Sequence, residues 1–174
     1  CNDMAVGRDG ALYVTDTTSS HILRWQPGAK TLAIWSSDPA LGGDKGSGLD
    51  GIAFGGDGNL YVTNFQSNAL IRVTMDAGDK PGAITRLTTS QPLRLPDGLR
   101  PIDGQRFAMA EGAGQIDLVT IDGDAARIEP LVSGLSSATG VGLFEHAIWY
   151  VQGELSYIFD PAKRNAKPPL PFRV

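Results

Sequence analysis

Residues 57–64 read Asp57-Gly58-Asn59-Leu60-Tyr61-Val62-Thr63-Asn64. An Asp-Gly pair favours a tight turn between two strands, because such a turn needs positive φ angles that glycine adopts without steric strain. The residues after the pair are aromatic, β-branched and apolar, which is typical of a buried strand. A shorter apolar segment, residues 50–54, precedes the turn. Residues 50–64 therefore predict two antiparallel strands joined by a hairpin.

This pattern occurs in four copies along the chain. The copies begin at Asn2, Asp50, Asp97 and Thr139, with spacings of 48, 47 and 42 residues. The first three share an apolar segment, an Asp-Gly turn and a second apolar strand, and the fourth keeps the two apolar segments without the turn pair. A repeat of this length is typical of the four-stranded blades of a β-propeller. The sequence therefore predicts an all-β propeller of antiparallel blades.

The remaining strands of each blade follow from polar turns and further apolar segments. We expect third strands at residues 21–25, 69–73, 115–121 and 154–159, and fourth strands at residues 31–35, 83–87 and 126–132. These place four blades at residues 2–36, 50–88, 97–133 and 139–174 of a single propeller domain or fragment. Because the chain begins inside a blade motif, we expect an open arc and not a closed four-bladed ring.

Composition excludes several classes of function. The net charge is −4 and no basic patch stands out, so nucleic acid is not an expected partner. No apolar run approaches the roughly 18 residues that a membrane-spanning helix needs. The single cysteine, Cys1, allows no internal disulfide and leaves the redox compartment open. We expect a periplasmic or secreted location in preference to a cytoplasmic one.

Polar residues stand at the same place in three of the four repeats. Asn2, Asp50 and Asp97 each come just before an expected innermost strand, so they should converge at the mouth of the central channel. Together they supply only oxygen ligands, which hard cations such as Ca²⁺ prefer. Asp97 is the expected general base. The alternative is that each residue only caps its own turn, as Asp and Asn often do.

The blade-start motifs also carry a family resemblance. Asn-Asp at residue 2, Asp-Gly at residue 50 and Pro-Asp-Gly at residue 96, with the Asp-Gly-Asn-Leu-Tyr-Val strand at residues 57–62, resemble the regucalcin (senescence-marker)/gluconolactonase family. The end of the chain, residues 157–161 and 171–174, also looks like bacterial members. The resemblance implies that the chain corresponds to the last four blades of a six-bladed propeller. It also implies a divalent cation, usually calcium, at the channel mouth.

The resemblance assigns roles to three residues. Asn2 matches an asparagine that contacts substrate, and Asp97 matches an aspartate that is both metal ligand and base. Asp50 stands where the family has a ligand asparagine, so the sequence departs from the pattern there. A further glutamate ligand of the family would fall in blades that precede these residues.

Three functional hypotheses follow. The first is a metal-dependent hydrolase of lactones or related esters, acting on a lactone or sugar-derived small molecule. The second is a non-catalytic propeller that binds a protein or a glycan. The third is a truncated gene product without a function of its own. The loops that would select a substrate carry no recognisable signature.

Overall fold

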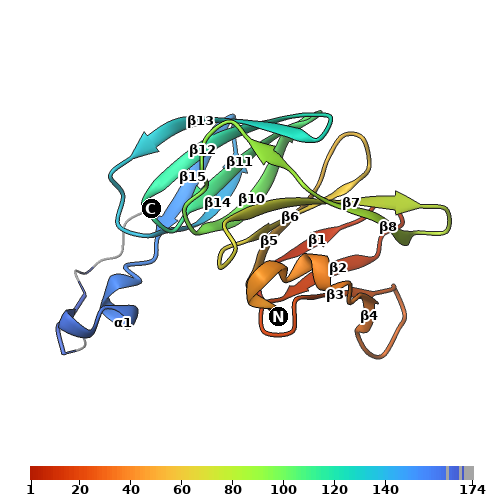
Figure 1. The fold of residues 1–174 in the computed structure, drawn as a ribbon, viewed down its shortest axis with the longest axis horizontal. Coiled ribbons are helices and arrows are strands. Elements are labelled where there is room, and N and C mark those ends of the chain that lie inside the picture. The colour runs from red at the N-terminus through yellow and green to blue at the C-terminus, as the bar shows by residue number, and fades with distance from the viewer. Residues whose placement is uncertain (164, 169, 171–174) are drawn as a thin grey trace.

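The computed structural model describes residues 1–163, 165–168 and 170, and within them the chain folds into four β-sheets (Figure 1). The first sheet comprises β1 (Met4–Val6), β2 (Leu12–Asp16), β3 (His21–Trp25) and β4 (Ala33–Ser36). The second comprises β5 (Leu49–Phe54), β6 (Leu60–Asn64), β7 (Ala69–Asp76) and β8 (Lys80–Arg86). The third comprises β10 (Pro96–Asp103), β11 (Arg106–Glu111), β12 (Gln115–Asp122) and β13 (Ala125–Ser133). The fourth comprises β14 (Ala138–Phe144) and β15 (Ala147–Gln152).

The strands named above pair antiparallel in chain order within each sheet, and β1, β5, β10 and β14 lie innermost. β1 packs on β5, β5 on β10, and β10 on β14. Figure 1 shows β1–β4 on the opposite side of the second sheet from β10–β13, and β14 and β15 overlap the third sheet in this view. This is the arrangement of β-propeller blades, so the predicted all-β fold class is confirmed.

The connection between the second and third sheets is not a plain loop. It contains β9 (Thr88–Thr89), which pairs in parallel with β13 and adds a fifth strand to the outer edge of the third sheet. The connection between the first and second sheets contains two 3₁₀ turns, Pro39–Leu41 and Gly43–Lys45.

The strand expected at residues 154–159 is wrong. The chain turns out of the sheet at Glu154, whose φ is 50°, and then forms the short helix α1 (Ser156–Phe159) and a 3₁₀ turn at Pro161–Lys163. Four consecutive residues such as Ser-Tyr-Ile-Phe carry no periodicity that separates a strand from a helical turn. No helix in the described residues is long and apolar enough to cross a membrane. Residues 171–174, part of the family resemblance, lie outside the described residues.

The Asp-Gly turns hold their hairpins as the sequence predicts. The Oδ1 atoms of Asp9 and Asp57 accept hydrogen bonds from the backbone N–H two residues further on, each at 3.0 Å. The glycines that follow, Gly10 and Gly58, have φ angles of 75° and 81°, a region that a side chain would strain. The aspartates at these turns are therefore structural.

Aromatic side chains fill the space between neighbouring blades. Tyr13 of the first blade is fully buried and meets Phe54 of the second edge to face, with ring centroids 5.1 Å apart. Tyr61 of the second blade meets Phe107 of the third at 5.0 Å. Burying one such side chain contributes roughly 1.5–3 kcal/mol. The core is therefore the set of interfaces between blades.

At the axis, glycine lets adjacent innermost strands touch. A Cβ atom on Gly51 would overlap the carbonyl oxygen of Asp97, and one on Gly98 would lie 3.1 Å from the Cα of Gly140. Threonine hydroxyls then join one blade to the next: Thr15 Oγ1 donates to Asp50 O at 2.6 Å, and Thr63 Oγ1 donates to Asp97 O at 2.7 Å. These bonds fix the backbone at the start of β5 and β10.

Replacing Thr63 with valine tests this link between blades. Thr63→Val keeps the shape of the side chain but leaves the buried carbonyl of Asp97 without its donor. We expect the free energy of unfolding to fall by about 1–2 kcal/mol in urea denaturation. Thr120→Val is the matched control, because the buried hydroxyl of Thr120 has no partner among the described residues, and it should be neutral or stabilising. Equal losses in the two variants would show that the Thr63 bond contributes nothing specific.

A carboxyl pair is buried inside the third sheet. Glu111 is 2% exposed and Asp117 is fully buried, and their side chains face each other from β11 and β12. Glu111 accepts from the backbone N–H of Arg94, and Asp117 accepts from Gln115 Nε2 at 2.6 Å. Burial, and then the neighbouring Asp117, raise the pKa of Glu111 to about 8. The pair therefore holds at least one proton near neutral pH.

This pair should make stability depend on pH in a defined direction. An unfolded Glu111 loses its proton near its ordinary pKa, whereas the folded one keeps it up to about pH 8. The contribution of Glu111 to stability is thus fully present below about pH 4.5 and is lost as the pH rises from there to about 8. Glu111→Gln should flatten this decline in a series of thermal melts and leave the protein more stable at pH 8. Glu129→Gln, at a partly exposed carboxylate paired with Arg127, is the control and should keep the wild-type slope.

Candidate functional site

The starts of β5 and β10 are irregular, and this irregularity sets the direction of Asp50 and Asp97. The register shifts between Leu49 and Ile52 in β5 and between Pro96 and Leu99 in β10, and Asp50 and Asp97 lie inside these shifts. Such bulges turn a side chain away from the regular alternation of a strand. Asn2 lies just before β1, where its backbone N–H donates to Thr15 O at 2.8 Å. All three residues thus stand at the same end of their blades.

The three predicted site residues line one cavity of about 790 Å³. Asn2, Asp50 and Asp97 come from three successive blades, and the structure brings them together as their shared place in the repeat predicts. Their chemical roles stay predictions. Residues that the sequence did not single out complete the lining, among them Thr17, Phe65, Leu95, Ser137, Leu155 and Phe159.

Asp50 and Asp97 form a tightly coupled pair of carboxyl groups. Burial raises the pKa of Asp50 to about 6, and the charge of Asp3 adds to this, whereas hydrogen bonding from Asp97 and Asn2 opposes it. Burial, and then the charge of Asp50, raise the pKa of Asp97 to about 8. Two carboxylates held this close repel each other unless a proton or a cation lies between them. Near neutral pH the pair therefore retains a proton or attracts a cation.

An ion pair that the sequence reasoning missed lies next to these carboxyl groups. Arg100 of β10 reaches across to Asp3 with two bonds, Nη1–Oδ2 at 2.6 Å and Nη2–Oδ1 at 2.8 Å. Asp3 Oδ2 also accepts from the backbone N–H of Ile52 at 3.1 Å. The pair joins the first, second and third blades at the axis. The sequence contained one sign of this ion pair: Arg100 stands at a strand position where the first two copies of the repeat have alanine.

The side-chain oxygen atoms at the channel mouth are ligands of the kind that a hard cation prefers. Asp50 and Asp97 offer carboxylate oxygens, and Asn2 offers an amide that already donates to Thr17 Oγ1 at 3.0 Å. Oxygen-only sets of this kind favour Ca²⁺ or Mg²⁺ over softer metals. No group of three or more His, Cys, Asp or Glu side chains in the described residues is arranged to hold a metal ion. Any cation here would need further oxygen ligands beyond those of these three residues.

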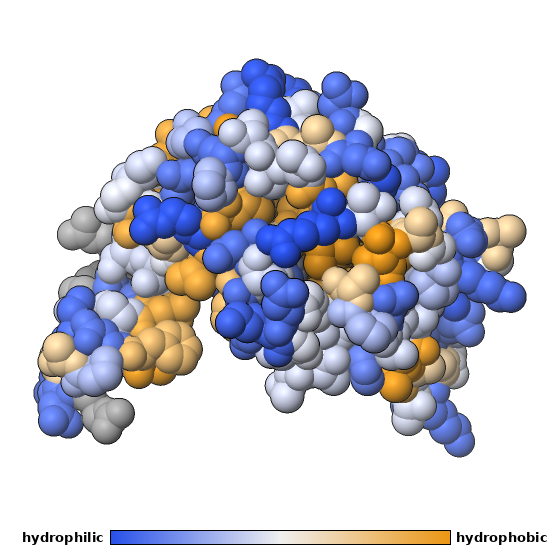
Figure 2. Space-filling model, in the orientation of Figure 1, coloured by the Kyte–Doolittle hydropathy of each residue, from blue (hydrophilic) through white to orange (hydrophobic). Residues whose placement is uncertain are grey.

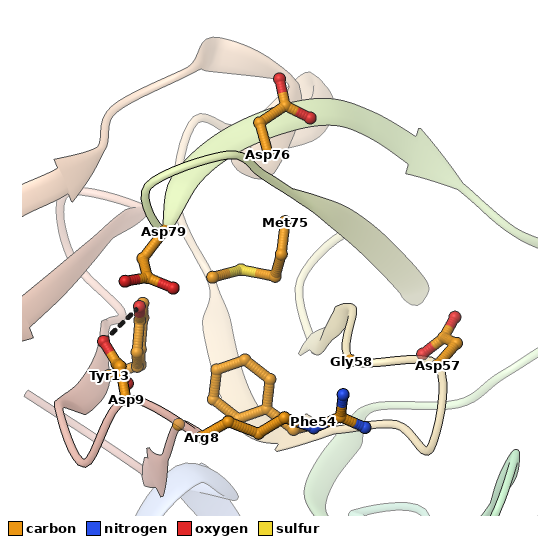
Figure 3. A pocket seen from close by; sticks show the side chains of 10 residues that line it. Arg8, Asp9, Tyr13, Phe54, Asp57, Gly58, Met75, Asp76 and Asp79 are labelled. Carbon is orange, nitrogen blue, oxygen red and sulfur yellow. Dashed lines mark hydrogen bonds between the residues drawn. The ribbon is translucent and has the colours of Figure 1, made fainter.

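A second hollow, of about 270 Å³, lies at the opposite end of the first two blades (Figure 3). Several carboxylates line it, but those of the turns are already engaged. Asp9 binds Arg24 and the Tyr13 hydroxyl, and Asp57 binds the Tyr61 hydroxyl at 2.9 Å. The polar groups of this hollow therefore serve the turns, and the mouth cavity remains the candidate site.

Comparison with known proteins identifies the fold of this chain and nothing more specific. The chain matches no protein-family model, and no curated protein has a matching sequence. Virginiamycin B lyase from Staphylococcus aureus superposes with a TM-score of 0.67 at 22% identity, over 86% of this chain and 47% of that one. A gluconolactonase from Xanthomonas campestris gives 0.62 at 21% identity, over 83% and 50%. A chain of a nidogen/laminin complex gives 0.65 at 19% identity, over 87% and 56%.

The chain thus spans about half the length of these solved structures. Identities this low show the fold and not the activity. The narrower resemblance to the regucalcin/gluconolactonase family stays a prediction, although gluconolactonases are among the structures that share the fold. The four sheets are blades of a β-propeller, an architecture that the chain shares with lyases and gluconolactonases.

Proposed function

We propose that these blades carry part of the active site of a metal-dependent hydrolase of lactones or related esters. The observation that carries the proposal is the contact between Asp50 and Asp97, two buried carboxyl groups from different blades that line one cavity, where burial raises both pKa values and Asp50 raises that of Asp97 further. A buried repulsive pair is unfavourable for folding, and active sites are where such pairs gather.

Each residue has a defined part in the proposed reaction. A bound divalent cation would keep both carboxyl groups ionised and polarise the carbonyl group of the ester. Asp97 would take the proton from the attacking water, for which its carboxylate must be ionised. Asp50 would be a second carboxylate ligand that balances the positive charge of the cation, and the Asn2 amide would donate a hydrogen bond to substrate. The Asp3–Arg100 pair would hold the three blade starts at fixed spacing.

The structural neighbours support an enzymatic role in general terms. One solved structure that shares the fold is a gluconolactonase, and two others are virginiamycin B lyase and streptogramin B lyase, all at or below 22% identity. The gluconolactonase among these neighbours supports a lactone as the substrate class. The proposal for this chain rests on its own residues first.

A non-catalytic scaffold that binds a protein or a glycan is the second candidate. It is favoured by the chain of the nidogen/laminin complex, which has the same fold. The two candidates differ in what they require of the site: a binding scaffold tolerates loss of Asp50 and Asp97, and a hydrolase does not. Substitution of these two residues therefore separates the candidates.

Asp97→Asn is the decisive change. The variant removes one ligand charge and the proposed base, so it should lose most of the stabilisation by Ca²⁺ and most lactone hydrolysis. A cation present at 100 times its Kd stabilises a folded protein by about 2.7 kcal/mol, which a thermal melt detects as a shift of several degrees. Loss of the base should lower kcat/KM at least about 100-fold in a lactone panel. Asp50→Asn should be milder, because it restores the residue that the family resemblance expects.

Asp103→Asn is the matched control, since Asp103 is an exposed turn residue paired with Arg106 far from the mouth. It should keep both the Ca²⁺ shift and the hydrolysis. In metal-free buffer at pH 8, Asp97→Asn should melt no lower than wild type, because it relieves the repulsion with Asp50. Full activity in Asp97→Asn would contradict the proposed base, and an unchanged Ca²⁺ shift would contradict the proposed ligand.

A further inference from the structure

The walls of the mouth cavity differ in chemistry from its floor. Four lining residues are apolar: Phe65 follows β6, Leu95 precedes β10, and Leu155 and Phe159 belong to the α1 segment. Figure 2 shows apolar surface on the part of the molecule near α1 that borders the hollow. The cavity thus has an oxygen-rich end at Asp50 and Asp97 and an apolar flank.

Leu95 is held in this wall by its backbone. Its φ is 57°, in the left-handed region that a leucine rarely adopts, and its side chain is 48% exposed. Asn68 Oδ1 accepts from Leu95 N–H at 2.8 Å, and Gly112 N–H donates to Leu95 O at 2.7 Å. Two residues earlier, Leu93 lies in the core at 3% exposed. Strained backbone is common at ligand-binding sites, so a strained and exposed leucine at the cavity indicates that its side chain contacts a ligand.

Several polar groups of the cavity are already bonded within the protein and so are not free for a substrate with many hydroxyl groups; Asp160 Oδ1, for example, accepts from the backbone N–H of Ala162 at 2.9 Å. Thr17 already donates to Leu49 O at 2.7 Å and accepts from Asn2, and Ser156 Oγ lies 3.0 Å from Lys163 Nζ. Hydroxyl groups that lose water without gaining a partner weaken binding. An alkyl or aryl group, by contrast, gains contact with every apolar wall residue.

We propose that the substrate is a lactone or ester with an apolar substituent, whose carbonyl end meets Asp50 and Asp97 and whose alkyl or aryl part lies against Phe65, Leu95, Leu155 and Phe159. The proposal rests on the hydrolase function proposed above and names its substrate class. A polyhydroxylated sugar lactone fits the walls poorly, whereas the volume of about 790 Å³ admits a ring with a chain of several carbons.

The test compares γ-butyrolactone, γ-hexalactone, γ-decalactone and glucono-δ-lactone as substrates of the protein in Ca²⁺. Each methylene that becomes buried should raise kcat/KM about threefold to fourfold, so burying half of the hexyl chain of γ-decalactone raises it on the order of 50-fold over γ-butyrolactone. Glucono-δ-lactone should be the poorer substrate. Equal rates along the series, or preference for glucono-δ-lactone, would overturn the substrate class and leave the hydrolase intact.

Leu95→Asn and Phe159→Ser remove the apolar wall without disturbing the core. Asparagine tolerates the left-handed φ at residue 95 better than leucine, and Phe159 is 75% exposed, so both variants should fold. Each should lower the preference for γ-decalactone over γ-butyrolactone about tenfold. Leu131→Asn is the control, because Leu131 is also 48% exposed but lies on β13 away from the cavity, and it should leave the preference unchanged.

A binding measurement separates failure of the substrate class from failure of the hydrolase. Calorimetric titration of the wild type and Leu95→Asn with γ-decalactone and γ-butyrolactone needs no turnover. One outcome is that no lactone is hydrolysed, that γ-decalactone binds more tightly than γ-butyrolactone, and that Leu95→Asn removes this difference in affinity. This outcome supports the apolar binding site and contradicts the hydrolase function. If both lactones bind equally, or Leu95→Asn leaves the difference in place, the apolar site is wrong.

Discussion

The innermost strands of successive blades approach each other so closely at the axis that glycine is required at the contact. A side chain on Gly51 would overlap the backbone of β10, and the hydroxyls of Thr15 and Thr63 bind the carbonyl groups of the residues that begin the next blade. Because these bonds fix the backbone at Asp50 and Asp97, the blade starts cannot move apart. Everything at the channel mouth depends on this close approach.

The close approach explains the electrostatics of the mouth. Two carboxyl groups on flexible loops would separate and ionise at their usual pKa, but Asp50 and Asp97 are held together on packed strands. Burial then raises both pKa values, and the charge of Asp50 raises that of Asp97 further. The Arg100 guanidinium does not relieve this, because it is engaged with Asp3. The site therefore stores an unfavourable interaction that a proton or a cation removes.

The two ends of the blades use acidic residues in different ways. At the turn end, Asp9 and Asp57 accept backbone hydrogen bonds and bind arginine or tyrosine, so their carboxylates stabilise the fold. At the mouth end, Asp50 and Asp97 face a cavity. The end sheets differ again, because Val6 and Trp149 expose apolar surface of the kind that packed blades bury between them. Position within a blade decides what an aspartate does, and its residue type does not.

The repeat determined most of the fold by itself. Asp-Gly turns and alternating apolar strands act locally, so the hairpins at residues 4–16, 52–64 and 99–111 follow from the residues that form them. The repeat also placed Asn2, Asp50 and Asp97 together, because equivalent positions around an axis meet at one end. Where the repeat fades, at residues 154–159, the sequence alone predicted a strand and the chain forms a helical turn.

Tertiary structure alone decided the remaining features of the site. The pairing of Asp3 with Arg100 joins residues 97 positions apart, and no local pattern specifies which charge meets which. The apolar walls come from three separate segments that no repeat relates, and Leu95 stands among them only because contacts with Asn68 and Gly112 impose its left-handed backbone. The raised pKa values likewise arise from burial, which is a property of the packed blades and not of any single residue.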